Sequence, residues 1–401
     1  MTAVSKYHER KERERMTAQA KRFLLTGGRS TSTLDLARQL HTVGHQVFTA
    51  DTTRCHICYL SNAISKNFVI PSPRFEPEAF IEVLLNIVTR EEIDMVIPTY
   101  EEVIYISRHL EKFPKSCSVF SDAFEKLHNL HNKWLFYCRQ QAHGIKAPKT
   151  VLIKCEEELK DLSFSKSYIL KASYSRSSQS ILKVNPELKT LPSLKIEPRN
   201  PWIAQEWLEG KKFCTYSVCQ EGVLKAHTTY PVQFSIEGNS CLNFKSIEHP
   251  GILDWVTKFV ALEKYTGQVG FDFFELPDGQ IYAIECNPRA TNGLLLFQSS
   301  DRLDRAFLND SNTVIHPVQG NCKQIAFGML LYGMKTAYKE KQLSTFFRTL
   351  FSTKDVVLNL KDLKPFFFQP FVFSVYIYQV FKWRLNLPSY FTYDFNWDGE
   401  S

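Results

Sequence analysis

The sequence predicts an α/β protein whose first part is a doubly wound parallel sheet and whose later part is α+β. In residues 21–120, short apolar strands alternate with segments of helical spacing, a pattern typical of parallel sheets covered by helices. Residues 270–293 instead show two apolar runs around Asp278-Gly279, which indicates an antiparallel hairpin. The chain has 401 residues, more than one core usually supports, so we expect two or three domains.

The composition is that of a globular protein, because 44% of the residues are hydrophobic and 23% are charged. Residues 1–22 hold seven Lys and Arg against three Glu and carry +4 of the net charge of +7, so we expect residues 1–20 to be a charged, flexible tail. The nearly balanced remainder argues against a nucleic-acid partner, which would require a basic stripe on a folded domain. Ten scattered cysteines, and a tail without the apolar core of a secretory signal, favour a cytoplasmic protein with reduced thiols.

In the N-terminal part we expect two helices, at 30–46 and 77–89, and four strands, at 21–28, 47–51, 95–99 and 118–120. Gly27-Gly28 and Asp51 resemble half of a dinucleotide fingerprint, but the complete GxGxxG is absent, and we interpret the glycines as turn geometry. Glu101 and Glu102 follow the third of these strands, at the edge where open α/β sheets bind ligands. They could contact a substrate, or only favour the start of the next helix.

The middle of the chain carries two lysines on predicted regular elements. Lys133 lies in the middle of a helix predicted over residues 125–143, and Lys171 lies near the end of a strand predicted at 167–173. The eight small or polar residues that follow, 173–180, form a loop whose hydroxyls, backbone N–H groups and Arg176 could surround an anion. The alternative is an ordinary polar hairpin loop.

The hairpin at 270–293 places two carboxylates face to face. Equal spacing about a two-residue turn pairs Phe274 with Ala283 and Asp272 with Glu285. Like charges on opposed residues destabilise a sheet unless a cation lies between them. The sequence therefore predicts a cation at this hairpin, although acids that simply face water are the alternative.

Asn287 lies two residues after Glu285 and adds an amide oxygen on the same face. Two carboxylates and an amide form an all-oxygen ligand set, which suits Mg²⁺ or Mn²⁺. Arg289, two residues further on, could bind a phosphate or a carboxylate through its forked guanidinium. This combination indicates a site that handles nucleotides.

Several of these residues, taken in chain order, resemble the ATP-grasp superfamily. The resemblance rests on Lys133, Lys171, the Ser-rich loop 173–180, the segment QEWLEG at 205–210, and the spacing of Asp272, Glu285, Asn287 and Arg289. It covers residues 22–310 and looks most like the carbamoyl-phosphate-synthetase-like and biotin-carboxylase-like branch. It implies a pre-ATP-grasp α/β domain at 21–120 and, at 121–310, an ATP-grasp fold of two α+β subdomains that clasp the nucleotide. It also implies a mobile lid at about 145–205, with an extension at 311–401.

The resemblance implies roles for individual residues. ATP would be bound by Lys133, Lys171, Ser175, Ser178, Glu206, Trp207, Leu208 and Glu209. Mg²⁺ or Mn²⁺, expected as two ions, would be held by Asp272, Glu285 and Asn287, and the catalytic side chains would be Arg289, Arg176 and Lys171. The implied enzyme is an ATP-dependent ligase that phosphorylates a small carboxylate to an acyl phosphate and couples it to an amine or another nucleophile. Relatives in this branch are often dimers, so a homodimer is possible.

Two departures from the family pattern support an alternative function. The loop 173–180 contains no glycine, and Lys212 stands where many relatives carry a ribose-binding acid, for which Glu209 is a doubtful substitute. The alternative is an ATP-binding regulator or scaffold that has lost turnover. The sequence also shows no glutaminase module, biotin-carrier signature or second ATP-grasp copy, which argues against a complete carbamoyl-phosphate synthetase or biotin carboxylase.

The most apolar run is FFFQPFVFSVYIYQVF, residues 366–381. Its sixteen residues are too few to span a bilayer, and we interpret the run as a buried or dimer-packing helix. An interfacial membrane contact and a hydrophobic substrate pocket are the alternatives.

Overall fold

The computed structural model describes residues 20–175, 181–185, 194, 196–236, 240–339 and 341–399. These residues form two compact units. The first contains the residues up to Ser121 together with Phe297–Ser311 and Val356–Phe395, and the second contains Asp122–Leu296, Asn312–Asp355 and the residues from Asn396 on. The contacts thus group two later segments with the N-terminal sheet. The predicted division of the chain into domains at 21–120, 121–310 and 311–401 stays a prediction.

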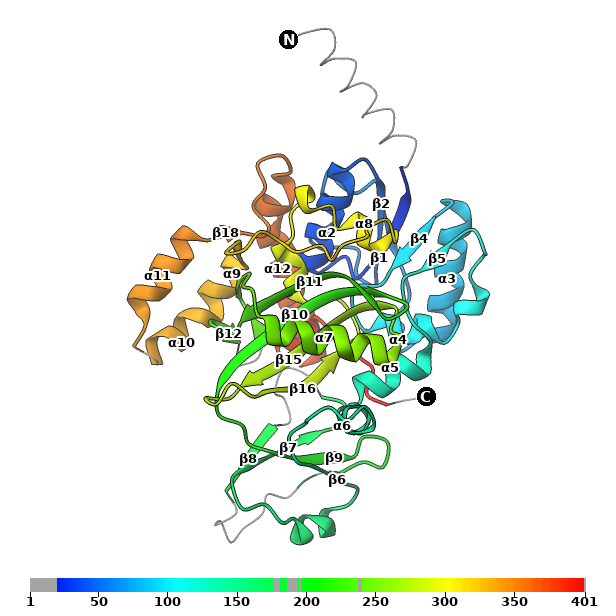
Figure 1. Ribbon diagram of the computed structural model, residues 1–401. Helices are drawn as coiled ribbons and strands as arrows, with labels where there is room; N and C mark the ends of the chain where they lie inside the picture. Colours follow the sequence, from blue (N-terminus) through cyan, green and yellow to red (C-terminus); the bar gives the residue numbers. More distant parts are fainter. Residues whose placement is uncertain are drawn as a thin grey trace. The chain divides into compact units, whose positions relative to one another are not determined.

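The first unit is built on a parallel sheet of strand order β3-β2-β1-β4-β5 (Figure 1). Its strands are β1 (Arg22–Thr26), β2 (Gln46–Asp51), β3 (Lys66–Val69), β4 (Met95–Ile97) and β5 (Ser118–Val119). The helices α2 (Thr31–Thr42), α3 (Pro77–Arg90) and α4 (Glu102–Ser107) alternate with them. The doubly wound sheet predicted from the sequence is confirmed, with β3, a strand of only four residues, as an addition.

The turn between β1 and α2 explains why Gly27 is a glycine. Gly27 has a φ of +74°, and a Cβ atom there would lie 2.8 Å from Thr99 Oγ1 and from the ring of Tyr100. Positive φ and close approach both disfavour any other residue. Ser30 then caps α2 by accepting a hydrogen bond from the Ser32 N–H. The interpretation of the glycine pair as turn geometry agrees with this local structure.

The second unit contains two antiparallel sheets, with strand orders β6-β9-β7-β8 and β11-β10-β15-β16. The strands of the first sheet are β6 (Thr150–Ile153), β7 (Tyr168–Ala172), β8 (Ile181–Val184) and β9 (Trp202–Glu206). Those of the second are β10 (Lys211–Gln220), β11 (Val223–Pro231), β15 (Gly267–Glu275) and β16 (Ile281–Asn287). The predicted α+β character of this part is confirmed.

The remaining elements are helices of varied length, short strands and single turns. The helices are α5 (Phe124–His131), α6 (Lys133–Ala142), α7 (Pro250–Glu263), α8 (Asp304–Phe307), α9 (Ala326–Gly328), α10 (Met334–Lys339), α11 (Leu343–Ser352), α12 (Lys364–Trp383) and α13 (Leu387–Tyr390). Short strands are β12 (Ser235–Ile236), β13 (Ser240–Cys241), β14 (Asn243–Lys245), β17 (Cys322–Gln324) and β18 (Lys354–Asp355). The turns of 3₁₀- or π-helix are η1 (Leu110–Lys112), η2 (Glu156–Asp161), η3 (Asn292–Leu296), η4 (Ser299–Asp301) and η5 (Met329–Gly333).

The single helix predicted over residues 125–143 is wrong, because the chain forms two helices that break at Asn132. The side chain of Asn132 accepts hydrogen bonds from the N–H groups of Trp134 and Leu135, at 3.0 and 3.1 Å, and so caps α6. An asparagine cap inside an otherwise helical pattern stops the first helix and starts the second. Lys133 is therefore the first residue of α6 and does not lie in mid-helix.

We expect Asn132→Ala to lower the free energy of unfolding by about 1 kcal/mol, because it removes the N-cap of α6. Chemical denaturation would measure this change. Asn62→Ala is a control, because that residue is also an asparagine but lies outside the helices, in the first unit. Equal stability of the Asn132→Ala variant and the unaltered protein would show that the cap does not stabilise α6.

The apolar run at 366–381 lies in α12 and is buried on one side only. Pro365, Val372 and Tyr376 are buried, whereas Phe367 and Phe381 are 73% and 76% exposed. The prediction of a buried helix is confirmed for the inner face, and dimer packing of the exposed outer face stays a prediction. Within the described part of the chain, no helix has the length and apolar character needed to cross a membrane.

Candidate functional site

The hairpin of β15 and β16 places Asp272 directly opposite Glu285, as the sequence predicts. The predicted turn, however, is wrong. The loop has three residues, closed by hydrogen bonds from the Leu276 N–H to the Gln280 carbonyl and from the Gly279 N–H to the Leu276 carbonyl, both 2.9 Å. Gly279 takes a φ of +80°, which three-residue hairpin loops require at their last position.

The longer loop shifts the pairing near the turn by one residue. Ala283 therefore lies opposite Phe273, and the predicted pairing of Ala283 with Phe274 is wrong. A bulge between Asp272 and Phe273 then shifts the pairing back. The two shifts cancel, which is why Asp272 and Glu285 face each other although the turn differs from the prediction.

Ile284 is the residue without a partner in the register, and Lys171 Nζ donates a hydrogen bond to its carbonyl at 3.4 Å. Lys171 belongs to β7 and is 2% exposed. A buried ammonium needs acceptors, because leaving water without them costs several kcal/mol. The irregularity of the hairpin thus supplies one acceptor to a lysine of the other sheet.

The two faces of the sheet have different roles. Phe271 and Phe273 pack against Trp255 of α7, with ring centroids 5.2 and 5.1 Å apart. Because side chains alternate along a strand, Asp272 projects from the opposite face. Glu285 shares that face as the paired residue, and so does Asn287, which pairs with Gly270. The three predicted oxygen ligands therefore lie together on the face away from α7.

Lys133 reaches this face from the start of α6. Its Nζ lies 3.3 Å from Glu285 Oε1 and donates a hydrogen bond of 2.8 Å to the carbonyl of Ser175. The side chain of Lys133 is 4% exposed and that of Glu285 is 26% exposed. The structure thus brings the two predicted lysines and the predicted acids into one cluster.

The cluster has an uneven distribution of charge. Burial and the nearby charge of Glu285 raise the pKa of Asp272 to about 6. Burial alone would raise the pKa of Glu285, but the charges of Lys133 and Lys171 outweigh it and lower that pKa. Burial lowers the pKa of Lys171 to about 8, with Lys133 adding to the effect. Glu285 is therefore the firmly ionised acid, and Asp272 is the one that a cation would help to ionise.

The donor set fits a hard cation. It consists of two carboxylates and one amide oxygen, the kind of ligands that Mg²⁺ and Mn²⁺ prefer. Among the described residues, no group of three or more His, Cys, Asp and Glu side chains is placed to hold a metal ion. A metal at this hairpin would thus depend on Asn287, whose Oδ1 accepts a 3.0 Å hydrogen bond from Arg289 Nη2.

The segment at 205–210 connects β9 to β10. The Trp207 N–H donates to the carbonyl of Ser167 at 3.1 Å, and its indole Nε1 donates to Glu209 at 3.1 Å. The carboxylate of Glu206 accepts from the Lys149 N–H at 3.3 Å, so it is already engaged. Leu208 is buried, and within the described residues no group accepts a hydrogen bond from its N–H. This free donor next to a buried apolar side chain could bind a flat heterocyclic ring.

The remaining predicted residues are only partly described. Ser175 is half-buried beside Lys133, whereas Arg176 and Ser178 lie outside the described residues. Lys212 pairs with Phe274 across β10 and β15, and its Nζ lies 5.3 Å from the centre of that ring. Gly210 approaches β15 so closely that a Cβ atom would lie 2.2 Å from the Glu275 carbonyl, which explains the glycine at the end of this segment.

Three residues near the cluster were not predicted. Cys214 pairs with Asp272 across β10 and β15 and therefore lies in the same row of side chains. Burial, with Lys133 and Arg289 adding to it, lowers the pKa of His131 to about 3, and its Nε2 lies 3.4 Å from the carbonyl of Trp397. The His131 ring is thus neutral. No local motif indicates these residues, because Trp397 comes from the far end of the chain.

Comparison with known proteins gives a matching domain model and several structures of similar fold. Residues 130–293 match the sequence model of the family described as ATP-grasp domain. No curated protein sequence matches the chain.

Similar solved structures include N5-carboxyaminoimidazole synthetase from Staphylococcus aureus complexed with ADP, with 12% identity and a TM-score of 0.60 over 80% of this chain and 86% of that one. A biotin carboxylase from Campylobacter jejuni has 12% identity and a TM-score of 0.56 over 72% of this chain and 71% of that one. An L-amino acid ligase from Bacillus licheniformis has 15% identity and a TM-score of 0.52 over 68% of each chain.

Proposed function

The chain contains an ATP-grasp domain, with the fold found in biotin carboxylase, and from this premise we propose that it is a Mg²⁺/ATP-dependent ligase. In this proposal the enzyme phosphorylates a carboxylate to an acyl phosphate and couples it to an amine or another nucleophile. The observation that carries the proposal is the cluster on one face of the hairpin, where Lys133 and Lys171 meet Asp272 and Glu285. Buried cations beside a pair of acids suit a ligand that brings both phosphates and a metal ion.

Nucleotide binding would draw on both sheets of the second unit. Lys133 and Lys171 would bind phosphate oxygens of ATP, joined by Ser175 and by Ser178 of the following loop. The N–H of Leu208 and its buried side chain would bind adenine, flanked by Trp207. Glu206 would take part through its backbone because its carboxylate is bound by Lys149, and Glu209, bonded to Trp207, lies beside the same segment.

Mg²⁺ or Mn²⁺ would be held by Asp272, Glu285 and Asn287, and we expect two ions, as in the family. When bound, the metal neutralises phosphate charge and so eases attack on phosphorus. Lys133, which now pairs with Glu285, would then be released toward the phosphates. The acids and lysines of the cluster would thus exchange partners between the free and the bound protein.

The reaction requires two displacements. In the first, an oxygen of the substrate carboxylate attacks the terminal phosphorus of ATP, the bond to the bridging oxygen breaks and ADP leaves. In the second, a nucleophile attacks the acyl carbon and inorganic phosphate leaves. Three cations would stabilise the charge on the transferred group: Lys171, Arg176 and Arg289. Arg289 is oriented by its hydrogen bond to Asn287.

The raised pKa of Asp272 predicts a pH-dependent response to Mg²⁺. In the folded protein this carboxyl binds a proton more tightly than in the unfolded chain, so its contribution to stability falls as pH rises from about 4 to about 6. A metal ion replaces that proton. We expect the rise in Tm caused by Mg²⁺ and ADP to be small near pH 5 and large near pH 7.5.

Thermal unfolding at the two pH values would measure this response. Asp272→Asn should give a small rise in Tm at both pH values, whereas Asp278→Asn, at the tip of the same hairpin, should behave like the unaltered protein. A response to Mg²⁺ that is equally large near pH 5 and near pH 7.5 would contradict the assignment of Asp272 as a ligand.

The proposal as a whole is tested by ATP turnover. The purified protein would be screened with small carboxylates, including amino acids and bicarbonate, each with and without an amine, and ADP and phosphate release would be measured together with the mass of the product. Substrate-dependent ADP release would support a ligase. Tight nucleotide binding without release for any pair would instead support the regulator, which the glycine-free loop and Lys212 favour.

We also propose a cytoplasmic location for this ligase. All ten cysteines are free thiols in the structure. Proteins exposed to oxidising compartments commonly pair their cysteines, whereas reduced thiols are typical of the cytoplasm.

A further inference from the structure

The outer face of α12 carries a continuous row of exposed aromatic side chains. Phe367, Phe371, Tyr378 and Phe381 are spaced by four, seven and three residues, which places them on one side of a helix. They are 73%, 56%, 64% and 76% exposed. We call these four residues the aromatic row. Moving large aromatic groups from water into an apolar environment is favourable, so an exposed row of them indicates a contact surface.

The inner face of α12 is held firmly on the first unit. Val372 and Tyr376 pack with Tyr390 of α13 in a buried cluster. Just before α12 in the chain, Asp362 forms an ion pair of 2.9 Å with Arg38, and both side chains are 7% exposed. A helix fixed in this way presents its outer face in one orientation.

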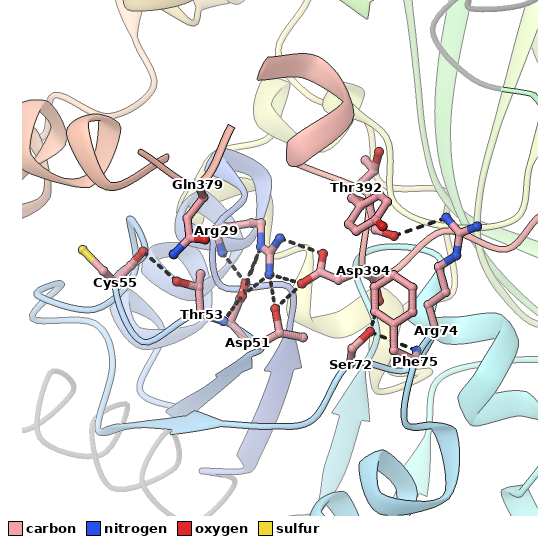
Figure 2. Close-up of polar contacts among 12 residues, drawn as sticks. Arg29, Asp51, Thr53, Cys55, Ser72, Arg74, Phe75, Gln379, Thr392 and Asp394 are labelled. Carbon is pink, nitrogen blue, oxygen red and sulfur yellow. Dashed lines mark hydrogen bonds and ion pairs between the residues drawn. The ribbon is translucent and has the colours of Figure 1, made fainter. Parts of the chain in front are cut away.

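The segment after α12 is anchored by a second ion cluster. Asp394 binds the guanidinium of Arg29 through both oxygens at 2.8 Å, and Arg29 also contacts Asp51 at 2.6 Å (Figure 2). The side chains of Arg29 and Asp51 are buried. Buried pairs of this kind are costly to break from one side, so the helix and its following segment stay on the sheet. The aromatic row is therefore a fixed surface of the first unit.

The charge around the aromatic row is positive at both ends. Just before and at the start of α12, the side chains of Lys361 and Lys364 are exposed, and at its end those of Lys382 and Arg384 are exposed. Residues 364–383 contain no Asp or Glu. Residues 356–384, which belong to the first unit, contain four Lys and Arg against one Asp, a net charge of +3. The face thus combines aromatic groups with basic ends.

We propose that the outer face of α12 binds an anionic lipid surface, with the helix lying in the plane of the interface. Aromatic side chains enter the boundary between headgroups and acyl chains, and Lys and Arg are attracted by acidic headgroups. A helix of 20 residues is about 30 Å long, so both basic ends reach the same surface. The lipid contact uses none of the residues that we propose to bind ATP or the metal.

Charge makes a second copy of the chain a poorer occupant. In a twofold contact along this face, antiparallel helices would bring Lys364 toward Lys382 and Arg384, and parallel helices would bring each lysine toward its own copy. Like charges at an interface weaken association and suppress that pairing. An acidic bilayer presents the opposite charge along the whole helix.

Sedimentation with vesicles tests the proposal on the full chain. We expect the protein to sediment with phosphatidylcholine vesicles that contain phosphatidylserine, and to do so at least about ten-fold more weakly with phosphatidylcholine alone. Phe367→Ser/Phe371→Ser/Phe381→Ser should reduce the partition coefficient by about ten-fold or more, and Lys382→Glu/Arg384→Glu by a similar factor. Phe351→Ser, which removes an aromatic side chain that is 83% exposed on α11, should leave binding unchanged.

Other outcomes would overturn the proposal. No sedimentation of the unaltered protein, or an equal loss in the Phe351→Ser control, would remove α12 as the lipid contact. A dimer seen by light scattering that the triple Phe variant abolishes would make this face an interface between copies. The far-ultraviolet circular dichroism and Tm of the triple variant show that it is folded, and its ADP release in solution should equal that of the unaltered protein. Failure here therefore leaves the proposed ligase untouched.

Discussion

Glu285→Gln is expected to reduce kcat for ADP release by about 1,000-fold, the largest effect of any substitution proposed here. Glu285 lies at the centre of the cluster, opposite Asp272 and 3.3 Å from Lys133. Its pKa is lowered by the two lysines, so it supplies a full negative charge at neutral pH. Glutamine keeps the size of the side chain and removes that charge, which a divalent cation requires.

Steady-state ADP release and Tm would be measured on the same preparation. Glu275→Gln is the matched control, because Glu275 also belongs to the β15–β16 sheet and contacts His249 at 3.3 Å, away from the oxygen ligands. It should retain nearly full kcat. A Glu285→Gln enzyme that is folded and turns over ATP at the normal rate would disprove the assignment of Glu285 to the metal.

Lys133→Met is expected to weaken ATP binding by about 100-fold, with a smaller effect on the binding of adenosine. The Lys133 ammonium is buried, and among the described residues it contacts the Ser175 carbonyl and Glu285. A bound phosphate would take the place of Glu285. Methionine fills the same space without charge, so the loss should appear in the phosphate-dependent part of the affinity.

Isothermal titration with ATP and with adenosine separates the two contributions. Lys126→Met, one helix earlier, is the control, because Lys126 pairs with Asp122 at 2.7 Å on the surface of the same unit. It should bind ATP normally. Equal losses of ATP and adenosine affinity in Lys133→Met would mean that the substitution distorts the adenine segment and that Lys133 does not bind phosphate.

The pairing of the two acids shows how much of the hairpin can be predicted from the sequence. Asp278-Gly279 and the flanking apolar runs predict a hairpin, and equal spacing predicts that Asp272 faces Glu285. The loop is one residue longer than predicted, and the bulge beside Phe273 compensates for it. A bulge depends on packing and hydrogen bonding around the strand, which here include the hydrogen bond from Lys171 to the Ile284 carbonyl, and strand spacing carries no information about these contacts.

The sequence contains a signal for the break at Asn132 that the predicted single helix does not take into account. Asparagine is among the preferred N-cap residues, and Lys133 follows it directly. Helical spacing on both sides concealed the cap, because Leu127, Leu130, Trp134 and Cys138 continue one apolar pattern. An N-cap at Asn132 makes Lys133 the first residue of α6.

Spacing along the chain was enough to predict the parallel sheet, the antiparallel hairpin and the pairing of Asp272 with Glu285, because those features depend on local patterns in the sequence. The approach of Lys133 and Lys171 to Glu285, the contact of His131 with Trp397 and the exposed face of α12 depend on packing between segments that are far apart. Such contacts form only when the gain in burial and charge pairing exceeds the entropy of closing long loops. Only the tertiary structure decides that balance, and it adds the buried lysines Lys133 and Lys171 to the pair of acids on the hairpin.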